Sequence, residues 1–186
     1  MSTTAIEALT ADAIRTTALQ DLCELVRNAV SGGASVGWVS VPSELEVSTY
    51  WRGVADQVQS GAMVLLVARA PSQVVGAVQL HFSARPNGAH RAEIARLLVH
   101  SSARRHGVGA ALMRAIEEAA LQRRVSLLVL DTRTGDPSQQ LYAKIGYILA
   151  GIIPHYARGT TGTLEPTSIM YKEIKEVSTP PHVLGK

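Results

Sequence analysis

Cysteine is almost absent from this chain: Cys23 is the only one among 186 residues. A single thiol forms no disulfide within the chain and cannot build a metal site that needs several cysteines. The apolar neighbours Leu22, Leu25 and Val26 indicate that Cys23 fills space in a helix and is not a nucleophile. The histidines show no metal-ligand spacing, such as two on one helix face, so we expect no metal site.

Aromatic residues and strong charge are also scarce. Phe, Trp and Tyr make up 4% of the chain and the net charge is +3, whereas a nucleic-acid surface needs a dense basic face with aromatic groups for base stacking. No apolar run approaches the ~20 residues of a membrane span, and the N-terminus lacks the basic-then-apolar pattern of a signal peptide. We therefore expect a cytoplasmic protein with no nucleic-acid or membrane partner.

The rest of the composition fits one α/β domain. A hydrophobic fraction of 46% over 186 residues supports one sizeable core, and the chain is too short for two independent domains. We assign residues 1–177 to this domain. Residues 178–186, which include Pro180-Pro181, are expected to form a flexible tail.

Apolar periodicity and turn signals predict the order of the elements. The continuous apolar run at 125–132 is typical of a strand buried in a parallel pairing, and together with the preceding strand and helix it predicts a right-handed crossover. A Gly/Thr loop at 159–163 separates the last two strands. The predicted elements are helices at 12–30, 43–60, 110–124 and 137–145, and strands at 63–68, 74–82, from Glu93, 125–132, 147–153 and 167–174.

The stretch from Glu93 to Gly109, EIARLLVHSSARRHGVG, organises these elements. It begins as a buried strand and ends in a basic, glycine-containing turn directly before a helix. Free backbone N–H groups and the positive end of a helix dipole meet at such a turn, so it forms an anion site. Because the turn also carries Arg104, Arg105 and His106, we expect the anion to be a phosphate.

Two motifs in this arrangement resemble those of the GNAT N-acetyltransferases. Residues 104–109, RRHGVG, resemble the family's R/Q-x-x-G-x-G/A acetyl-CoA loop, and residues 141–147, LYAKIGY, resemble its second signature. Ser101 stands where many members carry proline, which would only stiffen the turn. The resemblance implies a single-domain α/β GNAT fold with a central, mixed and mostly antiparallel sheet that splays at its central parallel strand pair and is flanked by helices.

Within that superfamily, the chain is similar to the tabtoxin-resistance acetyltransferases over roughly residues 20–174. The likeness rests on short segments spread along the chain. They are GGASVG at 32–37, PNG at 86–88, RAE at 91–93, LDT at 130–132, PHY at 154–156 and PT at 166–167.

The resemblance implies that acetyl-CoA is the co-substrate. Backbone N–H groups from Arg105 to Ala110 would cradle its pyrophosphate, and the Arg104 and Arg105 guanidinium groups would add charge-assisted hydrogen bonds, unless they are an ordinary solvated pair. The expected cofactor-binding residues are Leu98, Val99, Arg104, Arg105, His106, Gly107, Val108, Gly109, Ala110, Tyr142 and Lys144.

Three residues are candidates for proton transfer. A primary amine is protonated at neutral pH, so a carboxylate must take its proton, and the resemblance points to Glu93 and Asp131. Tyr142 would protonate the departing thiolate, and a backbone N–H freed by a strand bulge near Leu97 or Leu98 would polarise the carbonyl. The alternatives are a surface ion pair of Glu93 with a neighbouring arginine, a turn cap for Asp131, and a half-buried helix tyrosine for Tyr142.

These residues predict direct acetyl transfer to a primary amine in a ternary complex, without an acetyl-enzyme. The expected acceptor is a small amino-acid-like toxin or metabolite of the tabtoxinine-β-lactam type, with His155 and Tyr156 lining its pocket. Another acceptor, such as an aminoglycoside or a protein N-terminus, and a GNAT-fold protein that binds acyl-CoA without turnover remain alternatives. Apolar terminal strands also leave a homodimer possible.

Overall fold

A seven-stranded sheet organises the computed structural model, which describes residues 4–175. The strands lie in the order β1-β2-β3-β4-β5-β7-β6, and every neighbouring pair is antiparallel except β4 with β5. The predicted single-domain α/β fold with a mixed, mostly antiparallel sheet is therefore confirmed. The strands are β1 (Ala5–Ala8), β2 (Met63–Ala70), β3 (Gln73–Phe82), β4 (Arg91–Val99), β5 (Leu127–Arg133), β6 (Ile148–Arg158) and β7 (Leu164–Glu173).

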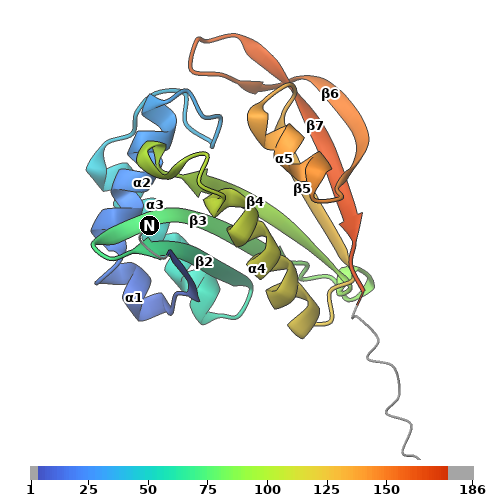
Figure 1. Cartoon of the computed structure of the whole chain (residues 1–186), viewed down its shortest axis with the longest axis horizontal. Helices are drawn as coiled ribbons and strands as arrows, with labels where there is room; N and C mark the ends of the chain where they lie inside the picture. The colour runs from blue at the N-terminus through green and yellow to red at the C-terminus, as the bar shows by residue number, and fades with distance from the viewer. Residues whose placement is uncertain (1–3, 176–186) are drawn as a thin grey trace, which may run out of the picture.

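Helices cover both faces of the sheet (Figure 1). One core lies between the N-terminal helices and the sheet, around Trp51 and Leu65, and the other lies beneath α4, around Leu112 and Leu80. Short 3-10 turns at Pro86–Gly88 and Ser101–Ala103 flank β4. No helix in residues 4–175 is long and apolar enough to cross a membrane. The helices are α1 (Ala11–Arg15), α2 (Leu19–Ser31), α3 (Glu44–Gln59), α4 (Val108–Gln122) and α5 (Pro137–Lys144).

The N-terminal region differs from the sequence prediction in two places. The single helix expected at 12–30 is broken into α1 and α2 after Arg15. The Thr16 hydroxyl donates to the Asp12 carbonyl oxygen at 2.7 Å, and threonine side chains that bond to the backbone in this way weaken a helix. Strand β1 was not predicted, because its four residues bury little and are held by pairing with β2.

Helix α3 begins at a capping box that the sequence contains. The Ser43 side chain accepts the Glu46 backbone N–H, and the Glu46 carboxylate accepts the Ser43 N–H at 2.8 Å. Leu45 lies in the first turn and is 72% exposed, so the buried face of the helix begins at Val47.

The central parallel pair splays as expected. Strands β4 and β5 pair only over Arg91–Ile94 and Leu127–Leu130, although β4 continues to Val99 and β5 to Arg133. Past this point, β5 stays paired with β7 and β4 stays paired with β3. Figure 1 shows the two strands side by side at one end and apart at the other. The sheet therefore opens in its centre.

The last two strands form a long hairpin at one edge of the sheet. Both are longer than predicted, and they turn at 159–163 as expected. The edge strand β6 carries large apolar side chains that are about half exposed. These exposed residues are Ile148, Leu149, Ile152, Ile153 and Tyr156. The predicted tail at 178–186 lies outside the described residues.

Candidate active site

A β-bulge in β4 shapes the site. Ala77 pairs with Leu98 and Gln79 with Ala95, so Arg96 and Leu97 together stand opposite the single residue Val78. Arg96 has a φ of 53°, which is uncommon for a residue with a side chain. A bulge leaves part of the ladder unpaired, and this is the local structure that the expected carbonyl-polarising N–H near Leu97 or Leu98 requires.

Glu93 and Asp131 lie on the same face of the sheet. Glu93 pairs with Val129, and Asp131 is two residues beyond Val129, so the strand alternation directs both carboxylates to one side. Both residues are exposed, and both line a cavity of about 550 Å³ at the opening between the strands. A second cavity of about 380 Å³ shares His81, Glu93, Asp131 and Tyr156 with the first, so the two adjoin at these residues.

The alternative roles for the two carboxylates do not occur in the structure. Helix α5 is capped by Asp136, whose side chain accepts the Ser138 N–H at 3.3 Å, and not by Asp131. Within residues 4–175, Glu93 forms no ion pair with a neighbouring arginine. The Thr167 hydroxyl lies 3.1 Å from Asp131 Oδ2 and 2.9 Å from the Thr132 carbonyl oxygen, so its one proton is shared between them.

Tyr142 reaches the same cavity from the other face of the sheet. It lies on α5 and packs in the core beneath α4, with 6% of its surface exposed. Burial raises the pKa of Tyr142, and the negative charges of Asp136 and Asp131 raise it further. The hydroxyl therefore keeps its proton at neutral pH. Because the sheet is open here, side chains from its two faces line one cavity.

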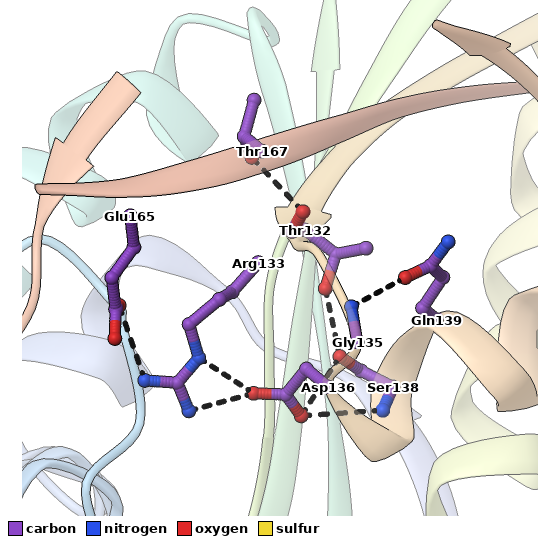
Figure 2. A network of polar contacts seen from close by, with 8 residues as sticks. All are labelled: Thr132, Arg133, Gly135, Asp136, Ser138, Gln139, Glu165 and Thr167. Atoms are coloured by element: carbon purple, nitrogen blue, oxygen red, sulfur yellow. Dashed lines mark hydrogen bonds and ion pairs between the residues drawn. The ribbon is translucent and has the colours of Figure 1, made fainter. Parts of the chain in front are cut away.

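A polar network holds the segment between β5 and α5, as Figure 2 shows. The Arg133 guanidinium donates to Asp136 Oδ2 at 2.8 Å and to Glu165 Oε2 at 3.3 Å. The Thr132 and Ser138 hydroxyl oxygens lie 2.7 Å apart, and Gln139 accepts the Gly135 N–H. Sequence reasoning missed this network. Asp136 before Pro137 is a readable helix-start signal, but the partner Glu165 is 32 residues from Arg133.

The glycine-containing loop has the geometry of an anion cradle. Gly107 is the N-cap of α4 with a φ of 80°, and Arg105 also has a positive φ of 63°. None of the backbone N–H groups from Arg105 to Ala110 donates to another described residue. A β-carbon at Gly107 would meet no atom within 4 Å, so the space beside this residue is open. A phosphate group of acetyl-CoA fits this donor set.

The other expected cofactor residues surround this loop. Arg104 Nε donates to the Val99 carbonyl oxygen at 3.1 Å, so part of this guanidinium serves the loop itself. Arg105, His106 and Lys144 are exposed, and Val108, Gly109 and Ala110 form the first turn of α4. The Leu98 side chain is buried in the core next to the N-terminal helices, which leaves only its backbone for a ligand.

A chain of three polar groups, with buried Gln79 at its centre, lines the cavity. Gln79, 1% exposed, donates through Nε2 to the Tyr50 hydroxyl at 2.7 Å, and its Oε1 lies 3.1 Å from His81 Nε2. Because Oε1 only accepts, Nε2 of His81 carries the hydrogen. His81 is the register partner of Glu93. Of the two residues expected in the acceptor pocket, Tyr156 lines both cavities and His155 lines neither.

Comparisons with known proteins agree with this geometry. The acetyltransferase (GNAT) family profile matches residues 20–147. An N-acetyltransferase of Azospirillum brasilense from the hisH-hisA intergenic region, described as uncharacterized, is 35% identical over 124 residues, which are 66% of this chain and 72% of that protein.

Solved structures share the fold. The ribosomal-protein-alanine N-acetyltransferase of Brucella melitensis gives a TM-score of 0.75 at 21% identity, over 91% of this chain and 99% of that one. The phosphinothricin acetyltransferase of Sinorhizobium meliloti was solved in complex with acetyl-CoA. It gives a TM-score of 0.74 at 19% identity, over 94% of this chain and 90% of that one. At these identities the two structures establish the fold alone.

The matched residues 20–147 are well over half of the chain, and they include the loop before α4, both candidate carboxylates and Tyr142. The predicted superfamily is thereby confirmed, and with it the acetyl donor. The chain belongs to the acetyltransferase (GNAT) family, whose co-substrate is acetyl-CoA.

Proposed function

We propose that the protein acetylates a primary amine of a small amino-acid-like toxin or metabolite, of the tabtoxinine-β-lactam type, by direct transfer in a ternary complex. One observation carries the proposal: Glu93, Asp131 and Tyr142 line a single cavity where β4 and β5 separate. In this scheme the acetyl-CoA diphosphate lies against the N–H groups of the loop before α4. Its thioester reaches the cavity through the opening in the sheet.

The two carboxylates prepare the amine. An alkylammonium group has a pKa near 10 and is no nucleophile until it loses its proton, so Glu93 or Asp131 takes that proton directly or through water. The amine nitrogen then attacks the acetyl carbon and forms the new C–N bond, and the nitrogen gives up its second proton to the other carboxylate or to water; a proton from solvent restores Tyr142 after turnover. Two exposed carboxylates on one wall also attract the cationic acceptor to this end of the cavity.

The other groups act on the thioester. The N–H freed at the bulge near Leu97 or Leu98 donates to the carbonyl oxygen as negative charge develops on it. When the C–S bond breaks, the Tyr142 hydroxyl gives its proton to the CoA thiolate. Its raised pKa keeps it in the protonated form that this step needs. Cys23 lies on α2, so no acetyl-enzyme is part of the scheme.

A screen for CoA release tests the proposal. Purified protein and acetyl-CoA are mixed with a panel of amines that includes tabtoxinine-β-lactam, amino acids, aminoglycosides and short peptides, and free thiol is measured. We expect Glu93→Gln or Asp131→Asn to lower kcat/KM by about 10²-fold at neutral pH. The loss in kcat/KM should become smaller as the pH rises towards the pKa of the amine, because a larger fraction of the acceptor is then already deprotonated. Tyr142→Phe should lower kcat without weakening acetyl-CoA binding.

Glu118→Gln is the control, because Glu118 is an exposed residue of α4 away from the cavity. If only aminoglycosides or only peptide N-termini are acetylated, that class of compound is the acceptor and the proposed small amino-acid-like acceptor is wrong. Acetyl-CoA binding detected by calorimetry, with no CoA released to any acceptor, would favour a non-catalytic acyl-CoA-binding protein. Unchanged kinetics in both carboxylate variants would overturn the catalytic assignment.

We also propose that the protein is a homodimer and that it works in the cytoplasm. The support for the dimer is the row of half-exposed apolar side chains on the edge strand β6, which a second copy would cover. The support for the location is the co-substrate, because acetyl-CoA is held inside cells.

A further inference from the structure

Arg96 stands in the cavity wall as a cation that no carboxylate of residues 4–175 pairs with. It lines the larger cavity together with Glu93, Asp131 and Tyr142. We propose that Arg96 binds a carboxylate of the acceptor and so selects amines that carry an acid group. This inference rests on the proposed function, because it assigns a role to a residue facing the same acceptor.

The bulge brings Arg96 to the acceptor side of the sheet. In a regular strand, alternation would direct residues 93, 95 and 97 to one face and residue 96 to the other. The extra residue in β4 and the positive φ of Arg96 break this alternation. The side chain instead lies over Trp38 and Tyr50, which pack against the core on the face that carries Glu93.

An aromatic frame fixes the guanidinium. Its central carbon is 5.4 Å from the ring centroid of Trp38 and 5.4 Å from that of Tyr50, and these two rings pack edge to face. Gly37, with a φ of 92°, lies so close that a β-carbon there would be 2.6 Å from Nη1 of Arg96. The position is thus prepared before any ligand arrives, which lowers the entropic cost of binding.

The contacts with Trp38 and Tyr50 use none of the hydrogen-bond donors of the guanidinium. No N–H of Arg96 donates a hydrogen bond, and no carboxylate pairs with it, within the part of the chain that the structure describes. The other arginine of the cavity, Arg133, is already held by Asp136 and Glu165. An arginine edge matches a carboxylate through two parallel hydrogen bonds.

The charged side chains of the cavity are complementary to a zwitterionic acceptor, which carries both an ammonium group and a carboxylate. Glu93 and Asp131 attract the ammonium group, and Arg96 supplies the positive partner on the same wall. Glu93 and Arg96 are three residues apart on β4, about 10 Å along the strand, and their side chains can converge on one small molecule. A neutral or purely cationic amine would leave Arg96 unmatched in a half-buried site, which disfavours such acceptors.

Matched acceptors test the role of Arg96. Each L-amino acid that the wild-type enzyme acetylates is assayed beside its carboxamide and its decarboxylated amine. We expect wild-type enzyme to prefer the acid by about 10- to 100-fold in kcat/KM, chiefly through KM. Arg96→Gln should remove that preference, chiefly by raising KM for the acid, and Arg96→Lys should retain part of it.

Acetyl-CoA binding by calorimetry and thermal melting confirm that the variants are folded. Arg114→Gln, an exposed arginine of α4, is the matched control and should keep the wild-type preference. An equal loss for acids and carboxamides in Arg96→Gln would assign Arg96 a structural role and overturn the inference. A wild-type preference for the carboxamide would also overturn it. If wild-type enzyme acetylates no member of any pair, the small-acceptor function fails and the role of Arg96 fails with it.

Discussion

His81 illustrates how one side chain at this site depends on its surroundings. Burial lowers the pKa of His81, Glu93 opposes that shift, and the positive charge of Arg96 adds to it. Its Nε2–H donates to Gln79, and burial favours the neutral form of the ring. A histidine next to a carboxylate would ordinarily gain a proton, and here burial has the larger effect.

This leads to a prediction for stability against pH. A histidine whose pKa is lowered by folding stabilises the native state above its unfolded pKa of about 6.5, and this stability is lost as the pH falls below that value. We expect the unfolding free energy of the wild type to fall from pH 7 to pH 5, by at most about 1.4 kcal/mol per pH unit from this group. Denaturant titrations at several pH values measure it.

In His81→Gln the fall should be smaller, because glutamine takes up no proton. His90→Gln, at an exposed position, should behave like the wild type. Identical pH slopes for all three proteins would show that His81 is not the group responsible.

At the scale of elements, the start of α5 depends on partners from two other segments. Asp136 caps α5, Arg133 is the last residue of β5, and Glu165 comes from β7. All three side chains are 23–29% exposed, so their charges are more than half removed from water. Since α5 carries Tyr142, this network also fixes where the candidate acid stands.

Arg133→Gln is therefore expected to destabilise the protein by about 1–2 kcal/mol, because it leaves two partly buried carboxylates without their cation. The control is Arg15→Gln. The Arg15–Asp56 pair is more exposed, with Asp56 at 72%, and should contribute less than about 1 kcal/mol. Urea unfolding of both variants compares them. Equal and small losses would mean that the network adds nothing beyond a surface ion pair.

At the scale of the whole molecule, the edge strand β6 is the feature that a single chain leaves incomplete. An exposed apolar edge invites association, and the register irregularities in β6 interrupt a regular ladder along it. We therefore expect a second copy to cover the side chains of β6 and not merely to extend the sheet.

Light scattering coupled to size-exclusion chromatography tests this expectation. The wild type should elute with twice the mass of the chain, and Ile152→Lys, at a residue 51% exposed, should shift it towards the monomer. Thr161→Lys, in the turn between β6 and β7, is the control and should remain dimeric. A monomeric wild type at the highest concentration that stays in solution would contradict the proposal.

The sequence by itself determined the single α/β domain, most of its elements and the family. Local signals suffice for these: the apolar periodicity over 43–60, the apolar run before Asp131 and the glycine-containing turn before α4 each act within one element or turn. The short strand β1 was not predicted, because its pairing with β2, and not a pattern in its own residues, holds it in the sheet.

Only the tertiary structure decided which side chains meet. Glu93, Asp131 and Tyr142 were candidates from the family resemblance, and their shared cavity exists because β4 and β5 separate after Ile94 and Leu130. The sequence did not predict Arg96 as an acceptor-binding residue, because regular strand alternation would direct its side chain to the face of the sheet opposite Glu93. A bulge depends on the register of two strands, and register is a property of the folded sheet that residues next to Arg96 do not encode.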